Sequence, residues 1–225
     1  MRRPYLAVAI FLLSLLAVNF KAAQAQTDAV APGSPPAGIL VLGDSLSAEY
    51  GLARDTGWVK LLEQRLQVSH PHYAVVNASI SGDTTSGGVA RLPALLKTHQ
   101  PQIVIIELGG NDALRGLQPT MTKTNLETLT RTTREAGAQP VIVGMQIPPN
   151  YGRAYAERFR AMFAEVAEHE NAELVPFLLE GIATDDDMFQ DDRIHPTAEA
   201  QPTLLNNVWP ILQPLLTPAS QAAAH

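Results

Sequence analysis

The sequence contains no cysteine among its 225 residues. Disulfide bonds, catalytic thiols and thiolate-bound metals are therefore excluded, and a folded domain of this chain must be held by its core alone. Basic residues are also in deficit, because 16 Lys and Arg stand against 22 Asp and Glu and give a formal net charge of −6. An acidic chain offers little of the basic surface that binds nucleic acids, so we expect no nucleic-acid partner.

An apolar run lies near the N-terminus, but it is too short to favour a membrane span. A basic start precedes the apolar residues 6–18, and Ala23 and Ala25 are small residues of the kind that a signal peptidase recognises. We predict a secretory signal peptide over residues 1–25, cut before Gln26. The alternative is an uncleaved membrane anchor, which the short run does not favour. A lipoprotein anchor is excluded because no cysteine follows the run.

The rest of the chain is predicted to be one exported domain with flexible ends. Residues 26–37 are rich in Pro, Ala, Gly and Ser, as in a flexible tether, and the Ala-rich residues 217–225 are predicted to be a disordered tail. Between them, residues 38–216 have the length of one domain, and a hydrophobic content of 46% is enough for its core. The predicted signal peptide carries three basic residues and no acid, so its removal changes the net charge to −9. A cysteine-free exported chain suits a bacterial periplasm, with secretion as the alternative, and we expect a monomer without a stable membrane span.

Strand and helix patterns alternate along the predicted domain. Continuous apolar strands separated by amphipathic helices indicate a sheet covered on both faces. The expected fold class is therefore α/β, a three-layer α/β/α sandwich with a five-stranded parallel sheet. The predicted strands are residues 39–42, 73–76, 103–106, 141–143 and 174–177. The predicted helices are residues 58–66, 89–96, 120–136 (with Thr120 as N-cap), 153–169 and 198–216 (bent at Pro210).

Four short polar segments lie next to these elements. They are Gly-Asp-Ser-Leu at 43–46, Ser-Gly-Asp at 81–83, Gly-Gly-Asn-Asp at 109–112 and Asp-Arg-Ile-His-Pro at 192–196. The first three follow predicted strands, and the fourth precedes the last predicted helix. Because ligands bind beyond the carboxyl ends of parallel strands, we expect these distant segments to meet at one edge of the sheet.

Ser45, His195 and Asp192 have the chemistry of an acyl-transfer site. Of the six histidines, only His195 follows an acid by three residues, and such a turn lets Asp192 accept a hydrogen bond from Nδ1 and leaves Nε2 free for the proton of Ser45. Asp191 is an alternative partner with a less apt spacing, and Asp44 is interpreted as a turn or strand-end residue. Each residue alone is also typical of a turn or a surface loop, so the inference rests on their combination.

Neutral donors for an oxyanion are present as well. The backbone N–H groups of Ser45 and Gly82 and the side-chain amide of Asn111 can converge on the anion that forms at a carbonyl oxygen. Gly82 and Gly110 lack a Cβ atom, so a substrate can approach the backbone closely there. The alternative is that both glycine segments are only tight turns.

Taken together, the four segments resemble the conserved blocks of the SGNH, or GDSL, hydrolase family, whose fold is flavodoxin-like. The likeness extends over about residues 39–216 to a subgroup of bacterial periplasmic esterases with arylesterase, thioesterase, protease and lysophospholipase activities. The resemblance implies Ser45 as nucleophile, His195 as base with Asp192 as its partner, and no metal or organic cofactor. It implies that the oxyanion donors are Ser45, Gly82 and Asn111. The matching stretches are residues 76–84, 90–97, 107–112, 150–153 and 190–196.

The resemblance also predicts where the substrate binds. Residues 145–149 are similar to the mobile substrate loop of the subgroup, with an additional proline at 149 that predicts a stiffer loop. Glu49 stands where the subgroup usually has glycine, and its carboxylate is expected to disfavour anionic substrates. The residues expected to contact substrate are Gly110, Gln146, Ile147 and Pro148.

The predicted function is that of a serine esterase acting on aryl and acyl esters, with acyl thioesters and lysophospholipids as further substrates. Its partner is therefore a small-molecule or lipid ester. One alternative is a carbohydrate or peptidoglycan O-acetyl esterase, which would prefer acetyl to octanoyl esters. Another, from a different class, is an envelope binding protein that keeps the fold without turnover.

Overall fold

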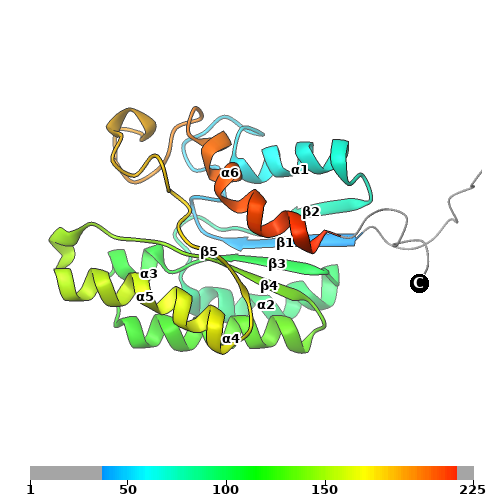
Figure 1. Ribbon diagram of the computed structural model, residues 1–225, viewed down its shortest axis with the longest axis horizontal. Helices are drawn as coiled ribbons and strands as arrows, with labels where there is room; N and C mark the ends of the chain where they lie inside the picture. Colours follow the sequence, from blue (N-terminus) through cyan, green and yellow to red (C-terminus); the bar gives the residue numbers. More distant parts are fainter. Residues whose placement is uncertain (1–36, 217–225) are drawn as a thin grey trace, which may run out of the picture. The chain divides into compact units, whose positions relative to one another are not determined.

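The computed structural model describes residues 37–216, which form a five-stranded sheet with helices on both faces. The predicted signal peptide, the predicted tether apart from its last residue, and the predicted tail lie outside the described residues, so they stay predictions. All neighbouring strands are parallel, in the order β2-β1-β3-β4-β5 (Figure 1). The strands are β1 (Ala37–Gly43), β2 (Tyr73–Asn77), β3 (Ile103–Glu107), β4 (Gln139–Val143) and β5 (Glu173–Val175).

The helices complete the three-layer α/β/α sandwich that the sequence predicted. They are α1 (Trp58–Ser69), α2 (Thr85–His99), α3 (Gly110–Leu114), α4 (Pro119–Glu135), α5 (Arg153–His169) and α6 (Gln201–Leu212). Helices α1 and α6 lie together on one face of the sheet, and α2, α4 and α5 lie on the other (Figure 1). Short 3₁₀ helices lie at Pro149–Tyr151, Asp186–Met188 and Gln213–Leu215.

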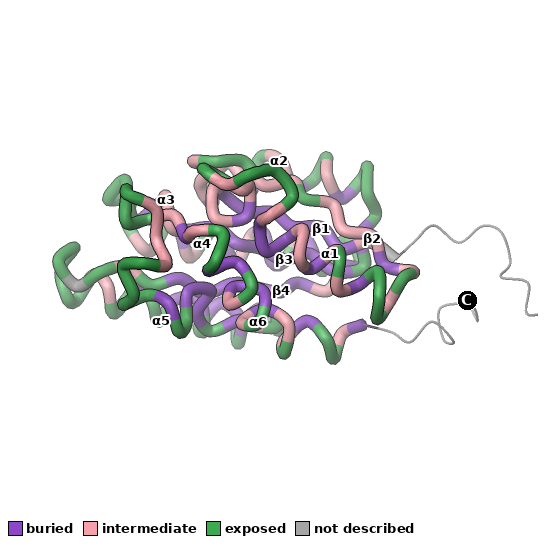
Figure 2. Tube along the Cα trace, turned by 90° about the horizontal axis from the view of Figure 1, so that it is seen from above, coloured by how far each residue is buried: buried purple, intermediate pink, exposed green. Residues whose placement is uncertain are grey.

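Aliphatic strands form the centre of the sheet. Every residue of β3 is buried, and the four aliphatic residues 39–42 of β1 are fully buried. Figure 2 shows these strands enclosed by helices whose outer faces are exposed. Full burial of one Val, Leu or Ile side chain stabilises a fold by roughly 1.5–3 kcal/mol, so the central strands form a firm base for the loops at their ends.

All five predicted strands and all five predicted helices are present, with bounds that differ by a few residues. β5 ends at Val175, earlier than predicted, because Pro176 has no N–H with which to extend the ladder. α4 begins at Pro119 with Gln118 as its N-cap, so Thr120 lies inside the helix and is not the cap. A proline at the first helical position loses no hydrogen bond, which explains the earlier start.

The last helix and one short helix differ further from the prediction. α6 is shorter than predicted and begins at Gln201, and the chain continues after Leu212 as a 3₁₀ turn. Pro210 lies within the last turn of α6. Helix α3 was not predicted, because its five residues are too few for a periodic pattern to appear. No helix within residues 37–216 is long and apolar enough to cross a membrane.

The strand order reverses at β1, which has β2 on one side and β3 on the other, as in flavodoxin-like sheets. The chain leaves β1 toward α1 on one face of the sheet and leaves β3 toward α4 on the other (Figure 1). Ligands of open parallel sheets bind at such a point, outside the carboxyl ends of the strands. Ser45 follows β1 and Asn111 follows β3, so both belong to this point.

Candidate active site

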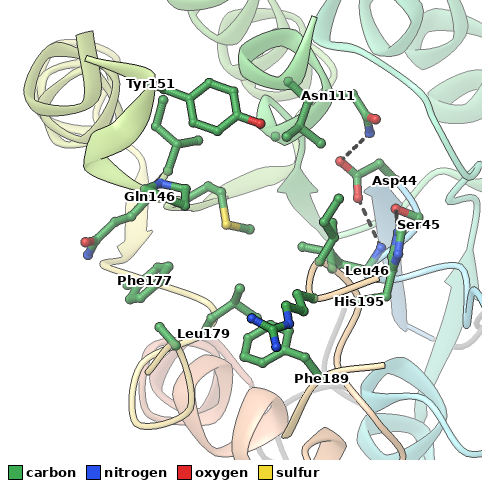
Figure 3. Close-up of a pocket in the computed structure, with 18 of the residues that line it drawn as sticks. Asp44, Ser45, Leu46, Asn111, Gln146, Tyr151, Phe177, Leu179, Phe189 and His195 are labelled. Carbon is green, nitrogen blue, oxygen red and sulfur yellow. Dashed lines mark hydrogen bonds between the residues drawn. The ribbon is translucent and has the colours of Figure 1, made fainter. Parts of the chain in front are cut away.

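A cavity of about 500 Å³ lies at the carboxyl ends of the strands. Its walls come from segments that follow β1, β3, β4 and β5. Figure 3 shows Ser45, Asn111 and His195 on one side of the cavity and a wall of apolar side chains on the other. The larger apolar side chains that line it are Leu46, Leu114, Met145, Ile147, Pro148, Tyr151, Phe177, Leu179, Phe189 and Ile194.

Ser45, His195 and Asp192 are joined by hydrogen bonds in that order. The Oγ atom of Ser45 lies 2.8 Å from Nε2 of His195, although the two residues are 150 positions apart. Nδ1 of His195 lies 2.6 Å from Oδ2 of Asp192. The other carboxylate oxygen of Asp192 accepts the backbone N–H groups of Ile194 (2.9 Å) and His195 (3.0 Å), which fixes the turn.

The environment of Asp192 sets the proton positions in this arrangement. Partial burial by itself raises the pKa of the carboxyl, but hydrogen bonds from the backbone and ring of His195, and from the N–H of Ile194, lower the pKa to about 2. A carboxylate only accepts hydrogen bonds, so the ring must carry its proton on Nδ1. Nε2 is then free to accept the hydroxyl proton of Ser45.

The loop that carries His195 is held by its neighbours. The N–H of Gln190 donates to the carbonyl of His195 (2.8 Å), and a left-handed Arg193 (φ 55°) forms the turn between them. Such a backbone conformation costs roughly 1–3 kcal/mol and persists where the surroundings fix it. The Tyr50 ring lies against the His195 ring with centroids 4.3 Å apart, and the side chain of Gln190 donates to the carbonyl of Tyr50 (2.9 Å). A Cβ atom at Gly51 would overlap Oε1 of Gln190.

Ser45 lies in a series of turns between β1 and α1. It does not lie at a helix N-terminus, because α1 begins only at Trp58. Glu107, the last residue of β3, stabilises the turn that carries Ser45. Its carboxyl accepts the hydroxyl of Ser47 (2.7 Å) and the N–H of Asp44 (3.3 Å).

Each of the three predicted oxyanion donors has an N–H bond that donates to no acceptor among residues 37–216. Among residues 37–216, the backbone N–H groups of Ser45 and Gly82 donate to no protein acceptor. Nδ2 of Asn111 donates to Oδ2 of Asp44 (2.9 Å), which uses one of its two N–H bonds. Asn111 lines the cavity together with Ser45, whereas Gly82 is not among the residues that line it.

Two arginines hold the loop that carries Gly82. Arg91 of α2 donates to the carbonyl of Ala78 (2.8 Å) and forms an ion pair with Asp83. Arg115, which follows α3, donates to the carbonyl of Gly82 (2.7 Å). Charge-assisted hydrogen bonds of this kind are among the stronger ones, so the loop is held from two sides.

The four residues predicted to contact substrate all line the cavity, and they are Gly110, Gln146, Ile147 and Pro148. Much of the remaining wall was not predicted. Met145, Phe177 and Leu179 are buried, and a buried apolar residue beside a cavity has the same sequence pattern as one in the core. Only their position directly after β4 and β5 distinguishes them, and β5 had been predicted to extend through Phe177.

The carboxylate of Glu49, which was expected to disfavour anionic substrates, is engaged in backbone contacts outside the cavity wall. It accepts the backbone N–H groups of Gly57 (2.8 Å) and Asp55 (3.1 Å), and Glu49 is not among the cavity residues. Glu49 has a left-handed backbone (φ 59°), which suits the glycine that the subgroup usually has there. Its two hydrogen bonds stabilise the loop before α1, and its charge does not lie on the cavity wall. Within the described residues, no three His, Asp or Glu side chains form a group that could hold a metal ion.

Comparisons with known proteins agree with this arrangement. The sequence model of the GDSL-like Lipase/Acylhydrolase family matches residues 41–201, a range that includes Ser45, Gly82, Asn111 and His195. The chain is 52% identical over 178 residues to esterase TesA of Pseudomonas aeruginosa, covering 79% of this chain and 89% of that protein. It is 42% identical over 204 residues to thioesterase 1/protease 1/lysophospholipase L1 of Escherichia coli K12, covering 91% of each.

Solved structures show the same similarity. The crystal structure of TesA matches with a TM-score of 0.78 at 52% identity, covering 80% of this chain and 99% of that chain. The psychrotrophic esterase EstA from Pseudoalteromonas, in a structure inhibited by monoethylphosphonate, matches with a TM-score of 0.75 at 40% identity. That match covers 79% of this chain and 97% of EstA.

The buried carboxyl of Glu107 predicts a pH-dependent stability. Complete burial, followed by the nearby charge of Asp44, raises the pKa of Glu107 well above 4.5, its ordinary value. A carboxyl with a raised pKa in the folded state binds its proton more tightly there, so it lowers stability progressively as the pH rises above 4.5. Glu107→Gln stays neutral and keeps an oxygen for Ser47. The melting temperature of the variant should therefore gain on that of the wild type as the pH rises from 4.5 to 8.

Glu107→Ala is the matched control for this measurement. It removes the acceptor of two buried donors, so it should lower the free energy of unfolding by about 1–3 kcal/mol at pH 4.5, and this loss should shrink as the pH rises because the variant also lacks the titrating carboxyl. Melting curves at a series of pH values compare all three proteins. Parallel curves of melting temperature against pH for the wild type and Glu107→Gln would contradict the role assigned to the Glu107 proton.

Proposed function

The chain belongs to the GDSL-like lipase/acylhydrolase family, and on this premise we propose that it is a serine esterase working through an acyl-enzyme at Ser45. The observation that carries the proposal is the contact of 2.8 Å between Oγ of Ser45 and Nε2 of His195. The contact of 2.6 Å between His195 and the ionised Asp192 supports it, because the imidazole is held in the tautomer that accepts the serine proton.

In the first half of the proposed reaction, His195 takes the proton of Ser45 while Oγ attacks the carbonyl carbon of the ester. The negative charge that develops on the carbonyl oxygen is stabilised by the N–H groups of Ser45 and Gly82 and by the amide of Asn111. The tetrahedral intermediate then collapses, the bond to the leaving oxygen breaks, and His195 gives its proton to that oxygen. The alcohol leaves, and the acyl group remains bound to Ser45.

In the second half, water repeats the attack. His195 takes a proton from water, the hydroxide attacks the acyl carbon, and the same three donors stabilise the oxyanion. The bond to Ser45 then breaks, Oγ recovers the proton from His195, and the carboxylic acid is released. Throughout both halves, Asp192 keeps its charge and stabilises the imidazolium that forms twice in each cycle.

The apolar wall of the cavity supports substrates with an extended acyl chain. Aromatic and aliphatic side chains follow β4 and β5, so we place the acyl chain against Met145, Phe177 and Leu179 and the leaving group toward His195. Gly110, Gln146, Ile147 and Pro148 would contact the same substrate. The relatives named esterase, thioesterase and lysophospholipase support acyl thioesters and lysophospholipids as further substrates. An O-acetyl esterase of carbohydrates would need a polar wall, so we keep this function only as the alternative outcome of a test below.

Export is part of the same proposal. The basic start, the apolar residues 6–18 and the small residues before Gln26 support a cleaved signal peptide and a periplasmic enzyme. When the full chain is produced in a Gram-negative host, the protein recovered from the periplasm should begin at Gln26, as measured by intact mass. A full-length product that stays with the membrane fraction would contradict cleavage.

The nucleophile is tested by Ser45→Ala. We expect hydrolysis of 4-nitrophenyl butyrate to fall to the background rate with the fold intact, because no other group can form the acyl-enzyme. Labelling by a fluorophosphonate probe should disappear in the same variant. Retained turnover or retained labelling would refute the role of Ser45.

Asp192 and Asp191 form a matched pair of controls. Asp192→Asn should lower kcat by about 10³–10⁴-fold, because the amide favours the wrong tautomer of His195. Asp191→Asn should leave kcat within a factor of about two, because surface substitutions without contacts have small effects. Equal losses in the two variants would contradict the assignment of Asp192.

The substrate class is tested by acyl-chain length. The kcat/KM for 4-nitrophenyl esters should rise from acetyl to octanoyl, because each buried methylene contributes about 0.8 kcal/mol. Leu179→Asp places a charge in the apolar wall, so it should reduce the value for octanoyl much more than the value for acetyl. A wild-type preference for acetyl would instead favour the O-acetyl esterase.

A further inference from the structure

We propose that Asp44 is a positioning residue of the oxyanion hole, which holds the side-chain amide of Asn111 so that its second N–H faces the carbonyl oxygen of the substrate. The inference rests on the proposed function, in which Asn111 is an oxyanion donor. It assigns a task to a buried acid that the reaction itself does not use.

The contacts of Asp44 divide between its two oxygens. Oδ2 accepts Nδ2 of Asn111 (2.9 Å), and Oδ1 accepts the backbone N–H of Leu46 (3.1 Å). Figure 3 shows both bonds, with Asp44 between Asn111 and the turn that carries Ser45. One carboxylate therefore joins the nucleophile turn after β1 to the donor in α3.

The contact with Asp44 decides which end of the Asn111 amide is available. The amide has an oxygen at one end and two N–H bonds at the other, and a carboxylate accepts only from the nitrogen. With one N–H bonded to Asp44, the nitrogen end is fixed toward the turn that carries Ser45 and the remaining N–H is left for a ligand. Among residues 37–216, the side chain of Asn111 has no other hydrogen-bond partner that could fix it.

Electrostatics argue that Asp44 acts through orientation. A carboxylate close to a developing oxyanion repels it, so the charge itself opposes the reaction. Asp44 is also only 2% exposed, and burial raises its pKa to about 6 despite the hydrogen bonds from Leu46 and Asn111. The other titratable groups that interact with it are His195, Asp83 and Glu107. Asp44 therefore opposes the reaction through its charge and destabilises the fold through its burial. Its hydrogen bond to Asn111 is the contact by which it can still favour catalysis.

A structural alternative exists, because Asp44 also holds the turn through Leu46. Asp44→Ser separates the two tasks. A serine hydroxyl can accept the N–H two residues further on, as in common serine turns, but it is too short to reach Asn111 in place of the carboxylate. The variant therefore keeps the turn contact and loses the amide contact.

The test is a double-mutant cycle on 4-nitrophenyl butyrate with Asp44→Ser, Asn111→Ala and the double variant. Asn111→Ala should lower kcat by about 10²–10³-fold, as removal of one oxyanion donor does elsewhere. Asp44→Ser should lower kcat at least about tenfold with KM little changed, because the lost interaction acts in the transition state. The double variant should be no slower than Asn111→Ala by more than a factor of about two, because Asp44 has nothing left to position.

Two outcomes overturn the inference. If the losses in kcat multiply in the double variant, Asp44 acts independently of Asn111. If Asp44→Ser has the kcat of the wild type, the carboxylate does not position the amide. Should Asp44→Ser fail to fold, Asp44→Asn, which keeps the shape of the side chain and an oxygen for Leu46, is used in the same cycle, and multiplied losses again refute the inference.

The wild type supplies a spectroscopic readout of the contact itself, while the loss in kcat with KM little changed separates positioning from a purely structural role. The side-chain amide resonances of Asn111 should shift with pH as Asp44 titrates near 6, and resonances that do not titrate would contradict a direct contact. Failure of the proposed function is distinguishable, because it appears as turnover that does not depend on Ser45. Multiplied losses in an enzyme that does depend on Ser45 refute only the inference about Asp44.

Discussion

The pairing of β1 with β3 is the constraint on which the site depends. In this parallel register Gly43 lies beside Glu107, so the two strands end at the same level. A Cβ atom at Gly43 would lie 2.8 Å from the carboxyl of Glu107, and that close approach lets the carboxyl reach the turn that carries Ser45. A slip of one residue would turn every side chain of a strand to the opposite face of the sheet. The register of β1 against β3 therefore places Ser45 and Asn111 on the same side of one cavity.

The sequence was sufficient for the fold class and for the residues whose spacing is itself a chemical requirement. An Asp-x-x-His turn can be recognised because a spacing of three residues lets the carboxylate of Asp192 reach the ring of His195 within one turn. The contact between Asp44 and Asn111 joins residues 67 positions apart and leaves no such local pattern. An aspartate after a strand is common in turns, so Asp44 alone indicated nothing more. The apolar cavity wall was hidden for a related reason, because burial and cavity lining select the same side chains.

Three carboxyl groups near the nucleophile show how environment gives one functional group different tasks. Asp192 is partly exposed and accepts several N–H hydrogen bonds, so it stays ionised and can stabilise an imidazolium. Asp44 is buried but receives two donors, which leaves its pKa near 6. Glu107 is enclosed completely and burial raises its pKa well above its ordinary value, so it supports the turn best as a neutral acid. Only the first of the three is suited to stabilise positive charge during the reaction.

The side chain of Gln190 bridges two loops that would otherwise be independent. Its amide nitrogen donates to the carbonyls of Tyr50 and Pro196, and its oxygen occupies the space above Gly51. A side chain at position 51 would displace that oxygen, so the flexible side chain of Gln190 would have to move away from the carbonyls that it contacts. A substitution at Gly51 would thus loosen the loop that carries His195 without altering the side chain of Ser45 or of His195.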